Sequence, residues 1–277
     1  MKTDEVITSL QNPKIKHLRT LQQKSSLRRT EGLFVVEGYK ELLQCLEAAY
    51  EIESVFFSSE LMTNEVECLL QRLSTSQQYE VSGKVYEHIA YRGSTEGVIA
   101  IVRNPNNRIE QLHLSEHPLI VVIEKVEKPG NVGAILRSAD AAGADAVIVC
   151  DELTDLYNPN LIRNSLGAIF SVPCVTCSSD ACIDFLKSKG IRILTAQLQD
   201  SELYYETDMR CGVALVMGAE STGLSDKWRR AANAHIRIPM LGKVDSLNVS
   251  VSAAILLFEA VRQRQCHQSF TTSIPSF

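Results

Sequence analysis

Long hydrophobic runs are missing from this 277-residue chain: none approaches the roughly 20 residues that a transmembrane helix needs. The opening stretch, MKTDEVITSLQNPKIK, lacks the apolar core of a secretory signal. We therefore expect a cytoplasmic protein. Apolar residues make up 45% of the chain, enough for full-sized cores, and the length suits two domains better than one.

Cysteine spacing typical of a disulfide framework is also missing. The eight cysteines are scattered, which indicates reduced and mostly buried thiols. The close pair is Cys174-x-x-Cys177, with Cys182 nearby. A zinc site would be expected to have a second pair at metal spacing, and the sequence contains none. We therefore predict no metal site.

The sequence lacks the two commonest nucleotide-binding motifs. Residues 218–225, GAESTGLS, have the spacing of a phosphate-binding P-loop. However, Leu224 stands where a lysine should neutralise the phosphates, and the Glu220 carboxylate would repel them. No G-x-G-x-x-G follows an expected strand, so a dinucleotide site is disfavoured as well.

Acidic residues are absent from positions 6–30, although the whole chain has a net charge of −5. This charge argues against generic binding of nucleic acid. The asymmetry nevertheless predicts a basic, RNA-binding arm on an acidic body, with an ordinary solvated helix face as the alternative. The six cations of the stretch are Lys14, Lys16, Arg19, Lys24, Arg28 and Arg29.

Strand-like and helix-like segments alternate along most of the chain, which predicts an α/β fold. The polar stretch that begins at Asn104 and runs to His117 interrupts the alternation and is the best candidate for a domain boundary. We therefore expect a smaller α/β domain, a linker, a larger α/β domain and a tail, at residues 1–103, 104–117, 118–265 and 266–277.

Two strand-like runs end in glycine-bearing polar loops. Val213–Met217 leads into residues 218–223, and the run that starts at Ile236 leads into Gly242 and residues 245–248. Ligands of α/β proteins bind outside the carboxyl ends of strands, and glycine lets the backbone approach a ligand closely. These loops are therefore candidate binding elements.

Arg137 is the odd residue of an otherwise apolar helix that starts near Asn131. If this arginine is buried or half-buried, it needs an anionic partner. The partner could be internal, Asp140 or Glu220, or it could be a phosphate or an activated hydroxyl, and both interpretations stay open.

Ser246 and Asn248 precede a helix with almost no polar face. Either residue could simply cap this helix. Several polar groups at the mouth of so apolar a helix are, however, more than one cap requires, and such a helix is buried all round or forms a subunit interface.

Three stretches, at Asn131–Arg137, Val216–Leu224 and Ile238–Ser250, resemble in order and spacing the motifs of SpoU/TrmH-type RNA 2′-O-ribose methyltransferases of the SPOUT class. The resemblance covers about residues 118–264. The stretch from Ile7 to Gly38 is similar to the L30e-like substrate-binding domain that is often fused to this class. Ser221 and Glu127-Lys128 depart from the common pattern, and these departures could alter the choice of substrate.

The resemblance implies a deep trefoil knot in the larger domain, a homodimer, and S-adenosylmethionine bound by backbone groups. It also implies a methyl transfer that acts on a guanosine of 23S-type ribosomal RNA. Transfer RNA as substrate, or a non-catalytic RNA-binding or ribosome-assembly protein, remain alternatives. The implied cofactor-binding residues are Gly218, Ile238 and Leu247, and the implied catalytic residues are Arg137, Asn131, Glu220, Ser246 and Asn248.

Overall fold

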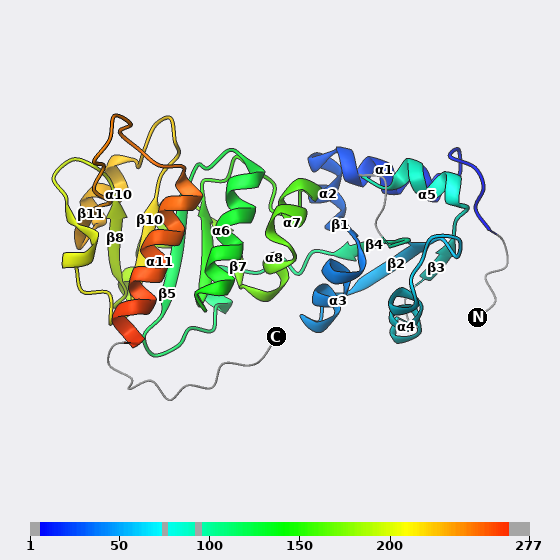
Figure 1. The fold of residues 1–277 in the computed structure, drawn as a ribbon, viewed down its shortest axis with the longest axis horizontal. Helices are drawn as coiled ribbons and strands as arrows, with labels where there is room; N and C mark the ends of the chain where they lie inside the picture. Colours follow the sequence, from blue (N-terminus) through cyan, green and yellow to red (C-terminus); the bar gives the residue numbers. More distant parts are fainter. Residues whose placement is uncertain (1–5, 74–76, 92–95, 266–277) are drawn as a thin grey trace. The chain divides into compact units, whose positions relative to one another are not determined.

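The computed structural model of the chain describes residues 6–73, 77–91 and 96–265 (Figure 1). The expected tail, 266–277, lies outside these residues. The chain divides into two compact units, each formed by two stretches of sequence. They are Met1–Asn106 with Asp155–Ser171, and Asn107–Thr154 with Val172–Phe277. In the described part of the chain, no helix combines the length and the apolarity that crossing a membrane requires.

A four-stranded mixed sheet forms the centre of the first unit, in the order β1-β4-β2-β3. β4 pairs antiparallel with β1 and β2, and β3 pairs parallel with β2. The strands are β1 (Leu33–Glu37), β2 (Ile52–Phe57), β3 (Gln77–Glu80) and β4 (Val98–Arg103).

Helices cover both faces of this sheet (Figure 1). α1 (Pro13–Gln23) and α5 (Gly83–Ile89) pack on one face, and α3 (Tyr39–Glu47) and α4 (Asn64–Arg72) lie on the other; α2 (Ser25–Glu31) follows α1. Asn12 caps α1 by accepting a hydrogen bond from the Lys14 N–H, and Pro13 occupies the first turn, where its missing N–H costs nothing. The core under α1 and α5 includes Ile15, Leu18, Leu21, Val35, Phe56, Tyr86 and Ile99.

The segment Asp155–Ser171 packs with this first unit, although it lies far beyond it in sequence. It contains α7 (Pro159–Ser165) and α8 (Ala168–Ser171). The ring of Tyr157 stacks on Phe34, with centroids 4.1 Å apart. Arg28 Nε donates to Asp155 Oδ2 at 2.6 Å, and both side chains are nearly buried. The first unit therefore takes in residues that the sequence analysis assigned to the larger domain.

The second unit contains a seven-stranded sheet in the order β7-β6-β5-β10-β8-β11-β9. Every neighbouring pair is parallel, and the alternation of these strands with helices confirms the predicted α/β fold. The strands are β5 (Leu119–Glu124), β6 (Ala146–Cys150), β7 (Cys174–Cys177), β8 (Arg192–Ala196), β9 (Glu202–Leu203), β10 (Val213–Met217) and β11 (Ala234–Arg237).

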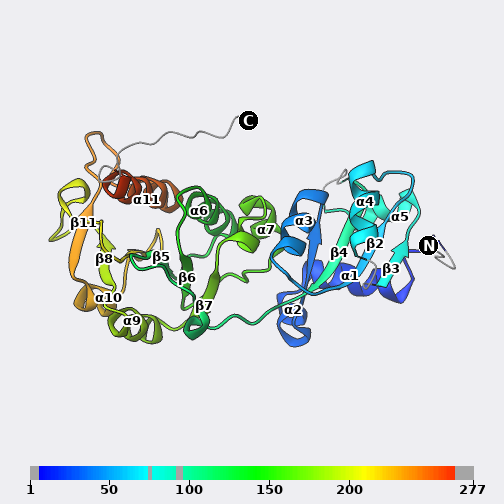
Figure 2. The ribbon, with the colours of Figure 1, turned by 90° about the horizontal axis from the view of Figure 1, so that it is seen from below.

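Helices cover both faces of this sheet too, because its strands are buried on both sides. α6 (Pro129–Ala141) and α11 (Val249–Gln265) lie side by side on one face, and α9 (Ser179–Ser188) and α10 (Asp226–Ala231) cover the other (Figure 2). Two short 3-10 helices, η1 (Ile109–Gln111) and η2 (Tyr204–Glu206), complete the described elements of the unit. The trefoil knot stays a prediction.

Candidate active site

Three loops meet at the carboxyl edge of the second unit's sheet. They follow β10, β8 and β11, which are neighbours in that order. Because the strands are parallel, their carboxyl ends lie along one edge of the sheet. The three loops can therefore enclose a single ligand.

These loops line two adjoining cavities of about 350 and 150 Å³, which we call the loop groove. Gly218 lines the larger cavity, Ile238 the smaller, and Leu247 both. The structure thus brings together the three residues that were expected to bind the cofactor. The residues that line both cavities are Ala196, Gln197, Leu198, Ser246, Leu247 and Ser252.

Gly218 is required by the path of the loop after β10. A Cβ atom at this position would lie 2.2 Å from the carbonyl carbon of Gly223, closer than any real contact. Ala219 and Gly223 form an isolated antiparallel bridge, so the loop folds back on itself. The absence of a side chain at Gly218 allows the two ends of the loop to approach each other closely beside the groove, an approach that we call the crossing.

A polar cluster forms where α6, this loop and α11 begin. Asn131 Nδ2 and Asn248 Nδ2 each donate to Glu220 Oε1 at 3.0 Å, and Asn248 Nδ2 also lies 3.2 Å from Asn131 Oδ1. Lys128 Nζ donates to Glu220 Oε2 at 3.1 Å. The three expected catalytic residues Asn131, Glu220 and Asn248 are therefore in direct contact.

The Glu220 carboxylate is stabilised in its charged form. Hydrogen bonds from Lys128 and Asn131 hold the pKa of this carboxyl below its ordinary value. The ion pair itself is solvated, because the Lys128 side chain is 73% exposed and that of Glu220 is 37% exposed. The ion pair therefore contributes little to the stability of the fold.

Asn248 caps α11, which is one of the two roles considered from the sequence. Its Oδ1 accepts from the Ser250 N–H at 3.0 Å and from Ser250 Oγ at 2.6 Å, in the first turn of α11. Its amide group faces Glu220. Ser246 is exposed in the wall of the groove, where its Oγ lies 3.2 Å from Asp245 Oδ1.

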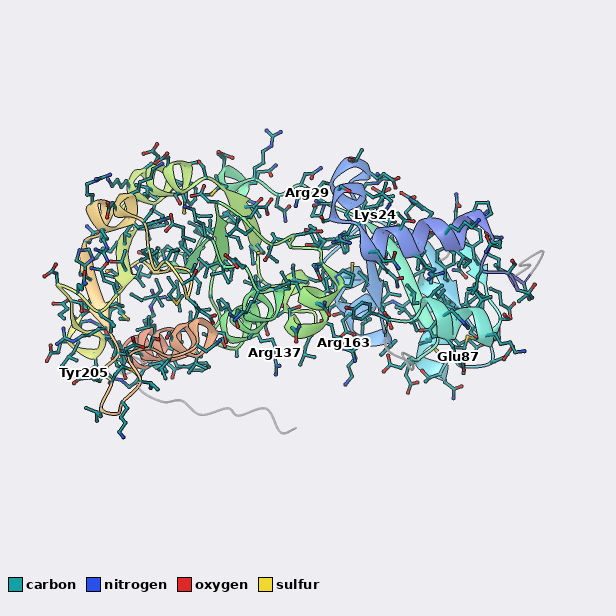
Figure 3. The ribbon with its side chains drawn as sticks, turned by 90° about the horizontal axis from the view of Figure 1, so that it is seen from above. Lys24, Arg29, Glu87, Arg137, Arg163 and Tyr205 are labelled. Atoms are coloured by element: carbon teal, nitrogen blue, oxygen red, sulfur yellow. The ribbon has the colours of Figure 1, made fainter. Side chains whose placement is uncertain are left out.

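Arg137 lies apart from this cluster in the single chain. The buried positions of α6, among them Leu136 and Ala139, face the sheet, so helical periodicity turns Arg137 outward. Figure 3 shows this side chain pointing away from the unit. Arg137 is exposed, so the condition under which it would need an internal anionic partner is not met. It forms no ion pair with any residue in the described ranges, and Glu220 pairs with Lys128 instead.

The basic segment divides into exposed and buried cations. Lys14, Lys16, Arg19, Lys24 and Arg29 are exposed, and Figure 3 labels Lys24 and Arg29. Arg28 is only 4% exposed, and its guanidinium donates to Asp155 and to the Leu21 and Gln22 carbonyl oxygens. This engagement removes Arg28 from the expected RNA contacts, because its donors are already used inside the unit.

Gln197 was missed by the sequence analysis. It follows β8 and lines both cavities, and its Oε1 atom is buried without a hydrogen-bond partner among the described residues. The available signal was the third polar loop, which begins at Gln197 directly after a strand-like run. A buried carbonyl oxygen without a donor is costly, so a ligand that donates there would be stabilised.

The sequence that forms the groove and its polar cluster is similar to known proteins. The SpoU rRNA Methylase family matches residues 118–258, and the MRM3-like substrate binding domain matches residues 12–100. The 23S rRNA (guanosine-2'-O-)-methyltransferase RlmB of Vibrio cholerae is 36% identical over 205 residues, which cover 72% of this chain and 83% of the relative. This chain is a member of the SpoU rRNA methylase family.

Other similar proteins match over nearly the whole chain. The 23S rRNA (uridine(2479)-2'-O)-methyltransferase of Streptomyces viridochromogenes is 27% identical, over 96% of this chain and 95% of the relative. The AdoMet-bound rRNA methyltransferase from Sinorhizobium meliloti has a TM-score of 0.87 at 30% identity, over 93% of this chain and 97% of that structure. For this SpoU family member, the predicted family, the class of enzyme and the cofactor S-adenosylmethionine are confirmed.

Two observations on the loop groove fit this cofactor. The crossing at Gly218 leaves main-chain groups open to the groove, and the buried Gln197 oxygen offers an acceptor for a ligand donor. S-Adenosylmethionine carries amino and hydroxyl donors on either side of a positively charged sulfonium centre. The residues of this family member therefore suit the group chemically.

Proposed function

We propose that the protein methylates the ribose 2′-oxygen of a guanosine in 23S-type ribosomal RNA, in the cytoplasm. The observation that carries the proposal is the contact of Asn131, Glu220 and Asn248 at the entrance to the loop groove. The Vibrio relative, named for a guanosine, supports the choice of base, whereas the Streptomyces relative is named for a uridine.

Gly218, Ile238 and Leu247 hold S-adenosylmethionine through their main-chain groups in this proposal. The Gln197 side-chain oxygen accepts from one of its donors. When bound, the cofactor supplies an electrophilic methyl group. The loop after β10 keeps its path because Gly218 and Gly223 cross closely, which fixes the main-chain groups before binding. We also propose that the larger domain contains the trefoil knot that the family resemblance implies.

A second copy of the chain completes the site. On α11, Val251 is 47% exposed and Phe258 is 48% exposed, although both are apolar. α6 lies beside α11 on the same face of the sheet (Figure 2), and Arg137 projects outward from it (Figure 3). A homodimer formed through this face would cover the apolar side chains. It would also bring Arg137 of one copy toward the groove of the other.

The chemistry requires a 2′-hydroxyl made more nucleophilic. The Arg137 guanidinium stays protonated and is an unsuitable base. It instead binds the neighbouring phosphate with its fork of donors and stabilises the negative charge that develops on the oxygen. The hydroxyl proton would pass to solvent, and the methyl group would exchange its bond to the cofactor sulfur for one to the 2′-oxygen, leaving a neutral thioether. Glu220 is occupied by Lys128, Asn131 and Asn248, so it positions the loops, and Ser246 shapes the groove wall.

Arg137→Ala tests the catalytic assignment. Loss of one charge-stabilising donor lowers kcat by about 10²–10³-fold, and S-adenosylmethionine affinity stays within about twofold. Methyl incorporation into RNA and isothermal titration measure the two quantities. Arg230→Ala removes another exposed arginine, on α10 at the opposite face of the sheet, and should leave kcat unchanged. Full turnover by Arg137→Ala would contradict the role.

Mapping ribose methylation in cellular RNA, with and without the gene, identifies the substrate. Loss of one methylated guanosine in 23S rRNA is the expected result. Loss of a position in transfer RNA, or of a uridine, would replace the proposed acceptor without affecting the enzyme class. No lost position, together with no binding of S-adenosylmethionine, would indicate a non-catalytic relative.

Five exposed cations of the first unit bind RNA phosphates in this proposal. They are Lys14, Lys16, Arg19, Lys24 and Arg29. Changing all five to Ala should weaken RNA binding and reduce the slope of log affinity against log salt by about 0.7–0.9 for each phosphate that is no longer neutralised. Arg72→Ala, on α4 at the other face of the sheet, is the control. An unchanged slope in the fivefold variant would place the RNA elsewhere.

A further inference from the structure

Three cysteine thiols come together on the α9 side of the second unit's sheet. The Sγ atoms of Cys150, Cys177 and Cys182 all lie within 4.8 Å of one another. Cys150 ends β6, Cys177 ends β7, and Cys182 belongs to α9. Cys150 and Cys182 are buried, whereas Cys177 is half-buried. The cluster is therefore enclosed by the core but reachable from one edge.

The register of the sheet explains which cysteines meet. Cys150 and Cys177 are direct partners in the parallel pairing of β6 with β7. Paired residues project to the same face, and residues three apart along one strand project to opposite faces. Cys174 therefore points away from Cys177, although the two are close in sequence. α9 covers the face that Cys177 shares with Cys150 and adds Cys182.

We propose that Cys150, Cys177 and Cys182 bind a thiophilic divalent cation of the Zn²⁺ class. Metal–sulfur bonds near 2.3 Å in a tetrahedral site place the sulfurs about 3.8 Å apart, so sulfur shifts of about 1 Å suffice. Half-buried Cys177 leaves the fourth position to a water molecule. One Zn²⁺ and three thiols give a tris-thiolate complex of charge −1, and three protons pass to solvent.

The neighbouring carboxylate does not take part in the site. Asp151, which follows Cys150, accepts hydrogen bonds from the Ser179 N–H and Oγ, so its carboxylate is already engaged. The three sulfurs therefore provide the ligand set without a carboxylate. This site departs from the prediction, made from the sequence, that the protein holds no metal.

Ordinary core packing is the competing explanation. Cys45 and Cys174 are buried single thiols of that kind, and they lie outside the cluster. The comparison of Cys177→Ser with Cys174→Ser separates the two explanations, because both changes alter one thiol of the same strand. The inference does not depend on methyl transfer, and neither readout below uses it.

The experiment titrates reduced full-length protein with Cd²⁺ and follows the sulfur-to-cadmium absorption in the ultraviolet. Competition with a chromophoric chelator then gives the Zn²⁺ affinity. The wild type and Cys174→Ser should bind one equivalent tightly. Cys177→Ser should lose more than the roughly 10–100-fold that removal of an outer-sphere partner costs. Equal binding by all three proteins, or no stoichiometric binding by the wild type, would overturn the site.

Thermal unfolding provides an independent readout. A cation that binds only the folded protein raises Tm with its concentration. Zn²⁺ should raise the Tm of the wild type and of Cys174→Ser, and leave that of Cys177→Ser unchanged. If Cys177→Ser is unstable without metal, Cys182→Ser replaces it in the same comparison. A shift of equal size in the cluster variant and in the wild type would refute the assignment.

Discussion

The carboxyl edge of the seven-stranded sheet has a closed half and an open half. Beyond β5 and β6 the edge is filled: buried Glu124 accepts from the Ser225 N–H and Oγ at 2.8 and 2.7 Å, and from Ser179 Oγ at 3.2 Å. The fully buried Trp228 donates from Nε1 to the same Ser179 oxygen. Beyond β10, β8 and β11 the edge holds the loop groove.

The difference shows how one sheet edge yields both a scaffold and a binding site. In the closed half, a large indole and a carboxylate with several donors leave no room for a ligand. In the open half, Gly218 adds no side chain to the wall of the groove, because the Gly223 backbone lies where its Cβ would be. The two halves are linked, because Ser225 follows the crossing loop and is held by Glu124. The closed half therefore fixes the end of a loop that the open half uses.

Gly218→Ala should have the largest effect, and it acts on the open half. The added methyl would lie 2.2 Å from the Gly223 carbonyl carbon, so the crossing must open. We expect S-adenosylmethionine affinity, measured by isothermal titration, to fall by about 100-fold or more. Gly242→Ala is the matched control, since a methyl there meets no atom within 4 Å. If Gly218→Ala bound S-adenosylmethionine as tightly as the wild type, the close approach at Gly218 would not be what makes the open half a binding site.

Glu124→Gln should act mainly on stability. Glu124 is 2% exposed, and its carboxyl oxygens accept from the Ser225 N–H and Oγ, while Ser179 Oγ is shared between Glu124 and Asp151. Bonds of this kind contribute about 1.5–3 kcal/mol each, and the amide retains some of them. We expect a net loss of about 1–3 kcal/mol in the free energy of unfolding, measured with urea. The exposed Glu127→Gln should change nothing. If Glu124→Gln lowered cofactor affinity as much as Gly218→Ala does, the two halves would not differ in function.

Acid should disorder the Glu220 cluster of the open half only at low pH. This is the smallest of the three effects, because no change is expected at neutral pH. The folded-state pKa of Glu220 is lowered, so the ordering of its cluster is complete above the ordinary glutamate value, about 4.3, and is lost as pH falls through the folded pKa. Cofactor affinity should stay constant from pH 7 to about 5 and decline below about 4.3. Glu220→Gln should lack this decline. A midpoint between pH 5 and 7 would assign the transition to another group.

Much of the fold followed from local pattern. The alternation of strand-like and helix-like segments predicted the α/β fold that both units have. β9 was missed because two residues, Glu202–Leu203, give no periodicity. The place of Asp155–Ser171 could not be predicted, because stacking of Tyr157 on Phe34 joins positions that are distant in sequence.

The sequence predicted those parts of the candidate site that depend on backbone conformation and on helix capping. Glycine loops at strand ends led to Gly218, and a polar group before an apolar helix led to Asn248. Long-range register decided the rest. Nothing local to Cys177 indicates that Cys150 is its neighbour. The exposure of Arg137 could not be decided from the sequence, because its helix is apolar around most of its circumference, whereas α6 buries only one face.

The return of residues 155–171 to the first unit has a consequence for engineering. A cut after Asn106 would separate Phe34 from Tyr157 and Arg28 from Asp155, and would leave a buried arginine and an aromatic stack open to water. Exchange of substrate-binding portions between relatives would therefore require two transplanted segments. A chimaera joined at a single point would express poorly even with every active-site residue intact.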